Sequence, residues 1–189
     1  MLIYLHGFNS SPQSFKARLL RSRMESLGRA SDFVCPALSH RPSEAIAQVE
    51  PALSAARAGL TTLVGSSLGG FYATWLAERY GVRAVLINPA VRPYDLLADY
   101  LGPQKNLYTG QEYELTKQHI AELGALEVDA LTPERYFLLV ETGDEVLDYR
   151  AAVERYRGCR QSVIPGGDHA CSDFARYLDI ILSFAGVVS

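Results

Sequence analysis

Short apolar runs alternate with stretches of helical period along most of the chain. Each apolar run is followed by a glycine or a polar turn, and then by a stretch whose apolar residues recur every three or four positions. This alternation predicts an α/β fold with right-handed crossovers and a mostly parallel sheet that has helices on both faces. We expect six strands, at residues 2–5, 33–35, 61–64, 84–87, 136–140 and 161–164.

The helical stretches give four expected helices. The first should begin near Pro12, with Ser11 as its cap, and end at Gly28. The second should start at about Ser43, and Pro51 is expected to kink or split it. The predicted inner faces of the four helices are Phe15, Leu19, Leu20, Met24 and Leu27; Ile46, Val49 and Leu53; Leu68, Phe71, Trp75 and Leu76; and Phe174, Leu178, Ile181 and Leu182.

The segment at about 92–132 departs from the alternation of strand-like and helix-like stretches. It is rich in proline, glycine and tyrosine, and its helical patterning is weak. A connection of this length inside a compact domain is usually a lid or a binding loop. We therefore expect a single α/β domain over residues 1–189, with a cap-like insertion at about 92–132.

The composition and net charge exclude some classes of binding partner. Apolar residues make up 48% of the chain, charged residues 21%, and the net charge is −3, so neither general disorder nor binding to nucleic acid or to an anionic membrane is expected. No apolar run is long enough to span a bilayer, and the N-terminal residues lack the features of a signal peptide. We expect a cytoplasmic protein with reduced cysteines and a small-molecule partner, and leave its oligomeric state open.

Residues 65–75, GSSLGGFYATW, pass from a strand pattern to a helix pattern within a few positions. The first five fit G-x-S-x-G with Ser67 at the centre. Small neighbours let the strand and the helix approach each other, while the central side chain projects from a strained turn. The pattern therefore predicts that Ser67, rather than the adjacent Ser66, is a nucleophile.

A serine of this kind needs a histidine and a carboxylate further along the chain. Asp144 follows the predicted strand 136–140, and His169 follows the strand 161–164. Because the carboxyl ends of parallel strands share one edge of a sheet, we expect these side chains to meet Ser67 there. Asp148 is the alternative acid and could equally cap the next helix, whereas Asp168 is interpreted as a turn residue or a modulator of His169.

The negative charge that develops during acyl transfer needs backbone N–H donors. We expect one from Leu68, at the start of the helix after Ser67, and a second from Phe8, in the loop after the first strand. His6 is expected to structure that loop through a hydrogen bond to the backbone. His40 and His119 lack the spacing of metal ligands and are expected at the surface or in the cap, so no metal site is predicted.

Five blocks of sequence, spread over nearly the whole chain, read LHGFNSSP (5–12), GSSLGG (65–70), NPAVRP (88–93), TGDEVLDY (142–149) and GGDHA (166–170). Together they resemble the small bacterial YqiA-type esterases of the α/β-hydrolase superfamily. The resemblance implies a minimal α/β-hydrolase fold and action on carboxylic esters, with acyl-CoA thioesters as a further substrate class. It also supports Ser67, Asp144 and His169 as a triad, although Asp168 stands where an amide side chain is expected.

The combined pattern favours a serine esterase that works through an acyl-enzyme and needs no cofactor. Two alternatives keep the same scaffold: a non-catalytic binder of small molecules or partners, and an acyltransferase or perhydrolase that uses the same triad. Phe8, Phe71 and Tyr72 are expected to line an apolar acyl pocket. Arg92, with Arg41 as a second candidate, is expected to contact the phosphates of an acyl-CoA.

Overall fold

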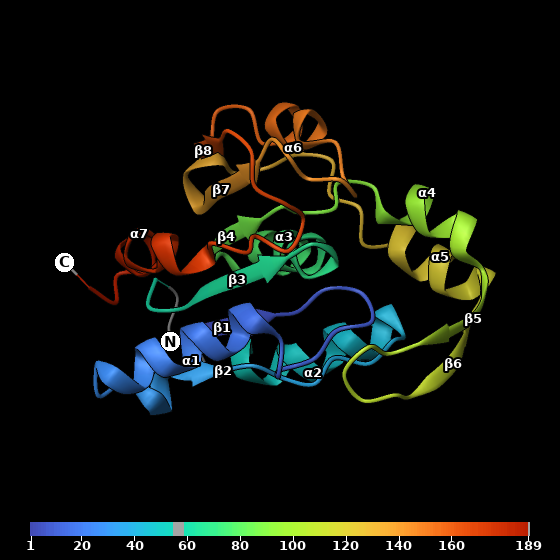
Figure 1. Ribbon diagram of the computed structural model, residues 1–189, viewed down its shortest axis with the longest axis horizontal. Helices are drawn as coiled ribbons and strands as arrows, with labels where there is room; N and C mark the ends of the chain where they lie inside the picture. Colours follow the sequence, from blue (N-terminus) through green and yellow to red (C-terminus); the bar gives the residue numbers. More distant parts are fainter. Residues whose placement is uncertain (55–58, 189) are drawn as a thin grey trace.

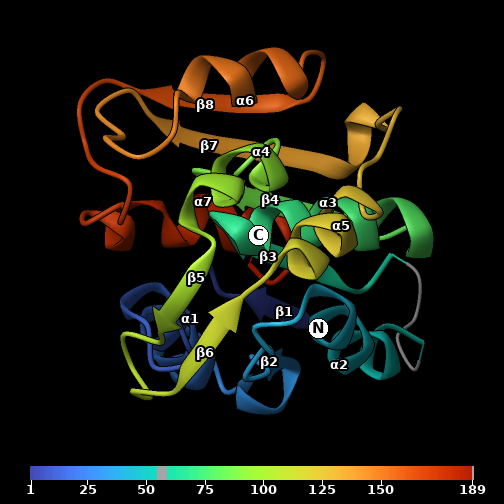
Figure 2. The ribbon, with the colours of Figure 1, turned by 90° about the vertical axis from the view of Figure 1, so that its right-hand side faces the viewer.

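The computed structural model describes residues 1–54 and 59–188, and a six-stranded parallel sheet forms its centre (Figure 1). The strand order is β2-β1-β3-β4-β7-β8, which Figure 2 shows from bottom to top. All six predicted strands are present, with ends that differ by no more than two residues. They are β1 (Leu2–Leu5), β2 (Phe33–Val34), β3 (Thr62–Ser66), β4 (Arg83–Ile87), β7 (Tyr136–Glu141) and β8 (Arg160–Ile164).

Helices cover both faces of the sheet because alternate strand residues point to opposite sides. Ile3 and Leu63 pack with α2, α3 and α6, whereas their neighbours Leu2 and Val64 pack with α1 and α7 (Figure 2). None of the helices in the described residues is both long and apolar enough to cross a membrane. The helices flanking the sheet are α1 (Phe15–Ser26), α2 (Pro42–Ser54), α3 (Leu68–Tyr80), α6 (Tyr149–Arg155) and α7 (Leu178–Phe184), with short 3₁₀ turns at Ala30–Asp32, Pro133–Arg135 and Phe174–Tyr177.

The start predicted for the first helix is wrong by one turn. The Ser11 hydroxyl accepts the Gln13 amide at 3.0 Å, and the Ser11 carbonyl accepts the Ser14 amide at 3.1 Å, so these residues form a separate turn before α1. Ser14 is the residue that precedes the helix. Phe15, which was predicted to lie on the inner face of this helix, is instead 43% exposed.

Of the two effects expected of Pro51, a kink or a split, the split does not occur, because α2 continues across this residue. Within the described residues, the helix runs from Pro42 to Ser54 and includes Pro51. The proline there removes one hydrogen bond, to the carbonyl of Ala47, and leaves the preceding turns intact.

The segment 92–132 has more regular structure than its sequence indicates. It contains α4 (Pro93–Leu97), a 3₁₀ turn at Ala98–Tyr100, the antiparallel hairpin β5 (Gly102–Lys105) and β6 (Glu112–Leu115), and α5 (Lys117–Gly124). These elements lie together at one end of the molecule (Figure 1). The hairpin was not predicted, because its strands are short, half-exposed and include a proline.

Candidate active site

Ser67 occupies the sharp turn between β3 and α3. Its backbone has φ 55° and ψ −122°, a strained conformation for a side-chain-bearing residue. The Ser67 carbonyl accepts the amides of Gly70 at 2.9 Å and Ala90 at 3.1 Å, and these bonds hold the turn. A Cβ at Gly69 would lie 2.1 Å from the carbonyl oxygen of Leu5. The glycine predicted for close approach of strand and helix is therefore required at this position.

The structure brings together the three side chains predicted to form a triad. The Ser67 Oγ lies 3.0 Å from His169 Nε2, and His169 Nδ1 lies 2.8 Å from Asp144 Oδ2. The Asp144 side chain is 2% exposed, whereas that of His169 is 20% exposed. The imidazole thus has a shielded carboxylate on one nitrogen and a hydroxyl on the other.

Asp144 is held as a carboxylate. Burial raises its pKa, but hydrogen bonds from His169 and from the backbone amides of Leu147 and Val146 outweigh burial and lower the pKa below its usual range. The two amides donate to Oδ1 at 2.8 and 2.9 Å, which leaves Oδ2 for the imidazole. The negative charge is therefore present where it can orient His169 and stabilise its protonated form.

The two rival carboxylates have other partners. Asp148 caps α6, where its Oδ1 accepts the Arg150 amide at 3.0 Å. Asp168 accepts the Ser172 amide at 3.1 Å, and hydrogen bonds led by that of the Ser172 side chain lower its pKa. Both positions match the structural alternatives that the sequence allowed for these residues.

The loop that carries His169 is fixed by groups that the sequence did not single out. Asn88 Nδ2 donates to the carbonyls of Asp168 and His169, at 3.0 and 3.3 Å. The buried Glu141 accepts the Asp168 amide at 2.9 Å, and Glu145 accepts the His169 amide at 3.0 Å. Asn88 belongs to the NPAVRP block, but only the folded chain reveals what it contacts.

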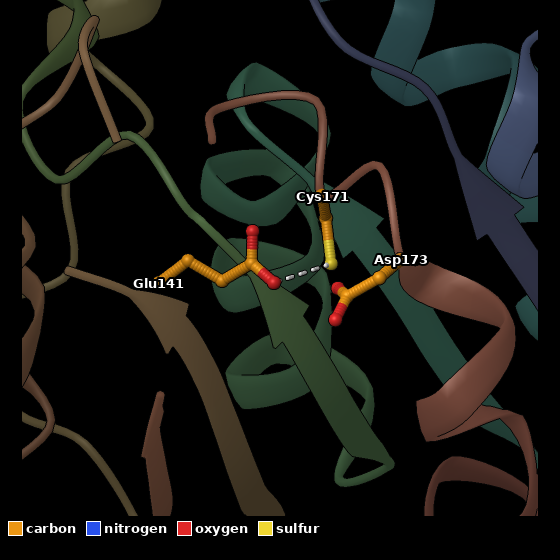
Figure 3. Close-up of side chains that lie close together, drawn as sticks. All are labelled: Glu141, Cys171 and Asp173. Atoms are coloured by element: carbon orange, nitrogen blue, oxygen red, sulfur yellow. Dashed lines mark hydrogen bonds between the residues drawn. The ribbon is translucent and has the colours of Figure 1, made fainter. Parts of the chain in front are cut away.

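Glu141, Cys171 and Asp173 point toward one another behind this loop (Figure 3), and their potential ligand atoms all lie within 4.8 Å. Burial raises the pKa of both the Glu141 carboxyl and the Cys171 thiol. The buried Oδ1 of Asp173 has no hydrogen-bond partner within the described part of the chain. It can therefore accept a hydrogen bond from a protonated Glu141 carboxyl. We interpret this cluster as a support for the histidine loop, since Glu141 accepts the Asp168 amide.

The two amides predicted to stabilise an oxyanion are free to donate. Within residues 1–54 and 59–188, neither the Leu68 nor the Phe8 amide has a protein acceptor. His6 structures the loop beside Phe8, since its Nε2 accepts the Leu38 amide at 3.1 Å and its Nδ1 lies 3.1 Å from the Gly7 carbonyl. Burial lowers the pKa of His6, in keeping with a neutral ring that accepts at one nitrogen and donates at the other.

A cleft of about 530 Å³ opens at Ser67 and His169. Phe8 lines this cleft, as expected for a substrate contact. Tyr72 instead lines an adjoining pocket of about 40 Å³, and Phe71 and Arg92 line a third cavity of about 100 Å³. The other walls of the main cleft include side chains that the sequence did not mark as site residues, namely Phe15, Lys16, Leu107 and Tyr108.

His40 and His119 also meet, although 79 positions separate them in the chain. His40 Nδ1 lies 2.9 Å from His119 Nε2. His119 lies in the 92–132 segment as expected, but it is buried in α5 rather than placed at the surface, and its Nδ1 accepts the Thr116 amide. The pair therefore joins α5 to the loop that precedes α2.

Several solved structures have the same architecture, and some of their descriptions name a hydrolase or lipolytic enzymes. A putative hydrolase from Agrobacterium vitis S4 superposes with a TM-score of 0.73 at 20% identity, covering 97% of this chain and 87% of that one. The metagenome-derived lipolytic enzymes LipS and LipT give 0.73 at 19% identity, with 98% and 92% covered. Est1E from Butyrivibrio proteoclasticus gives 0.72 at 12% identity, with 98% and 88% covered.

These similarities establish the fold, in agreement with the α/β-hydrolase architecture expected from the sequence. A family model described as "Uncharacterised protein family (UPF0227)" matches residues 1–186, nearly the whole chain. The resemblance based on the five sequence blocks is thereby confirmed: the chain belongs to the UPF0227, or YqiA, family and has an α/β-hydrolase fold.

Proposed function

We propose that this protein is a serine hydrolase of carboxylic esters. The observation that carries the proposal is the continuous hydrogen-bonded series from Ser67 through His169 to Asp144, with contacts of 3.0 and 2.8 Å. A serine hydroxyl becomes an effective nucleophile when a base accepts its proton and a third group orients that base. The similar folds described as hydrolases and lipolytic enzymes add support.

The reaction proceeds through an acyl-enzyme. Ser67 Oγ attacks the ester carbonyl while His169 Nε2 takes the hydroxyl proton, and the imidazolium then gives that proton to the departing alcohol. Water attacks the acyl-Ser67 ester with His169 again as the base, which releases the acid and restores the serine. Asp144 remains ionised throughout and stabilises the imidazolium. The steps use side chains, backbone amides and water, so we expect no cofactor.

The Leu68 and Phe8 amides supply the oxyanion hole in this mechanism. Leu68 is the first residue of α3, where backbone N–H groups and the helix dipole both favour negative charge. Removal of one donor of this kind typically lowers kcat by about 10²- to 10³-fold. The 92–132 segment acts as a cap over the cleft, which Leu107 and Tyr108 at its hairpin tip line. Acyl-CoA thioesters are the second substrate class that we propose.

Hydrolysis of p-nitrophenyl butyrate by wild type, Ser67→Ala and Ser66→Ala tests this function. We expect Ser67→Ala to lose at least about 10⁴-fold in kcat, because the nucleophile is gone. Ser66→Ala is the matched neighbour and should keep most of the activity. Equal rates for wild type and Ser67→Ala would contradict the proposal.

A fluorophosphonate probe separates an enzyme from a binder that merely uses the same scaffold. The probe should label wild type at Ser67, located by mass spectrometry of the modified peptide, and leave Ser67→Ala unlabelled. Comparison of Asp144→Asn with Asp148→Asn then identifies the acid. Asp144→Asn should cost about 10⁴-fold in kcat, and the reverse ranking would assign the role to Asp148.

A further inference from the structure

A second group of polar atoms faces the cleft at the start of α1, and the reaction described above does not use it. Ser14, Phe15 and Lys16 line the same cleft as Ser67 and His169. Ser14 precedes the helix, and the other two are its first residues. This end of α1 therefore borders the space in which a substrate would lie.

Lys16 brings a positive charge to the cleft and, within the described residues, is in no ion pair. Its ammonium donates to the carbonyl of Ala170, and within the described residues no carboxylate lies within ion-pair distance of it. The carboxylates of Asp168, Glu141 and Asp144 lie beyond ion-pair distance and act on Lys16 only through longer-range attraction. Burial lowers the pKa of Lys16, as expected for a cation that has lost water and gained no paired anion.

Ser14 adds an unsatisfied hydroxyl. The residue is only 8% exposed, and its buried Oγ has no hydrogen-bond partner of normal length in the part of the chain that the structure describes; the Tyr4 hydroxyl, which lines the same cleft, interacts with it only at longer range. It does not cap α1. Buried hydroxyls are normally paired, so a donor without an acceptor at the wall of a cleft indicates that a ligand supplies the acceptor.

The amino end of α1 also favours a negative charge. The helix has twelve residues, no acidic residue in its first turn and no capping side chain. Its first backbone N–H groups have no intrahelical acceptor, and its dipole places partial positive charge at this end. An ammonium, a free hydroxyl and a helix amino end at one wall together favour an anion.

We propose that Lys16, Ser14 and the amino end of α1 form an anion subsite, and that the preferred substrate is an ester that also carries a carboxylate. This inference rests on the proposed esterase function. Lys16 is the one lysine or arginine among the described residues that line the cleft, so the cleft offers one cationic contact, which suits a carboxylate monoanion better than a phosphate dianion. Phe15, Leu107 and Tyr108 supply apolar surface at the same cleft for the intervening carbons.

Two matched pairs of esters test the subsite. Glutarate mono-p-nitrophenyl ester is compared with p-nitrophenyl valerate, which places the carboxylate on the acyl side. The butyrate ester of p-hydroxybenzoate is compared with phenyl butyrate, which places it on the alcohol side. In at least one pair, wild type should have a kcat/KM about ten- to hundredfold higher for the acidic ester, the gain of a charge-assisted hydrogen bond. No preference in either pair overturns the proposal.

Variants identify Lys16 as the source of the preference. Lys16→Gln keeps a donor for the Ala170 carbonyl but removes the charge, so the ratio of kcat/KM for acidic over neutral ester should fall to near one. Lys16→Arg should retain a ratio above one. Lys117→Gln, an equal charge change on the exposed start of α5, should leave the ratio at its wild-type value. Equal losses for both esters in Lys16→Gln would assign Lys16 to bracing the histidine loop and overturn the subsite.

Binding measurements keep the subsite testable if the esterase function fails. In Ser67→Ala protein, calorimetric titration compares glutarate mono-p-nitroanilide with valerate p-nitroanilide, and p-butyramidobenzoate with butyranilide. A preference for the acidic ligand in either pair that disappears in Ser67→Ala/Lys16→Gln supports the anion subsite even when no ester is hydrolysed. Equal affinities in both pairs reject it, even when neutral esters are hydrolysed through Ser67.

Discussion

Asn88 and Glu141 are joined by a hydrogen bond of 2.9 Å, in which Asn88 Oδ1 accepts the Glu141 amide. The same Asn88 side chain donates through Nδ2 to the carbonyls of Asp168 and His169. Asn88 follows β4, Glu141 ends β7 and the histidine loop follows β8. A single buried amide group thus fixes the ends of three neighbouring strands relative to one another.

Asn88→Asp tests whether this arrangement positions His169. The carboxylate can still accept the Glu141 amide, but it cannot donate to the two carbonyls and repels them instead. We expect kcat for p-nitrophenyl butyrate to fall about 10²-fold, the size of effect that a small misplacement of a catalytic group produces. Near-ultraviolet circular dichroism should remain native-like. Wild-type kcat would show that the histidine loop holds its place without Asn88.

The lowered pKa of Asp144 predicts a specific dependence of stability on pH. A carboxylate whose pKa is lowered by folding stabilises the folded state above its unfolded pKa of about 3.9, and this contribution is lost as the pH falls through the folded value. Asp144→Asn removes the titrating group. Between about pH 5 and about pH 2, the free energy of unfolding of Asp144→Asn should therefore fall less steeply than that of wild type.

Urea unfolding at a series of pH values measures these slopes. Asp99→Asn, at an exposed position on the 92–132 segment, is the control and should follow wild type. Parallel curves for wild type and Asp144→Asn would mean that the hydrogen bonds to Asp144 do not favour its charged form.

The sequence was sufficient to predict the sheet and the three residues of the proposed triad because their signals are local. Ser67 stands in a glycine-rich turn, and Asp144 and His169 each follow an apolar run, so knowing that parallel strands share one edge brings them together. The partners of Glu141 and Lys16 could not be predicted in this way. Glu141 looks like the polar end of a strand and Lys16 like one residue of a solvated helix face, and their environments arise only when distant loops pack against them.

The walls of the cleft were hardest to predict for the same reason. Phe71 fits an acyl pocket by its place next to the elbow, but it lines a separate cavity with Arg92 rather than the cleft at Ser67. Leu107 and Tyr108 reach the cleft from a hairpin whose strands are short, half-exposed and include a proline. Pocket composition depends on the orientation of whole elements, which sequence periodicity does not specify.

Close backbone packing at the elbow predicts opposite effects for two glycine substitutions. Gly69→Ala would place a Cβ 2.1 Å from the Leu5 carbonyl oxygen, and backbone on both sides prevents relief, so we expect a loss of at least about 2 kcal/mol in the free energy of unfolding. Gly124→Ala meets no atom within 4 Å in α5 and should stabilise the protein by about 0.4–1 kcal/mol. Chemical denaturation of both variants measures the difference, and a Gly69→Ala protein as stable as wild type would contradict the observed packing.

Tyr113→Phe tests whether the hairpin of the 92–132 segment is coupled to the oxyanion loop. The Tyr113 hydroxyl donates to Asn9 Oδ1 at 2.7 Å, and burial raises the pKa of this hydroxyl to about 12. Asn9 has a positive φ of 50° and directly follows Phe8, the proposed oxyanion donor. Loss of the hydroxyl should cost about 1 kcal/mol of stability. It should also lower kcat by up to about tenfold, because Asn9 is freed to relax and the Phe8 amide moves with it.

The matched control is Tyr100→Phe, which removes an exposed hydroxyl from the same segment and should change neither quantity. Reaction with the fluorophosphonate, whose phosphoryl oxygen occupies the oxyanion hole, gives a second readout: the labelling rate should fall in parallel with kcat for Tyr113→Phe. If stability falls while kcat and the labelling rate remain at wild-type values, the hydrogen bond anchors the hairpin without positioning the oxyanion loop. The cap would then be independent of the reacting groups, and its contribution would be limited to the walls formed by Leu107 and Tyr108.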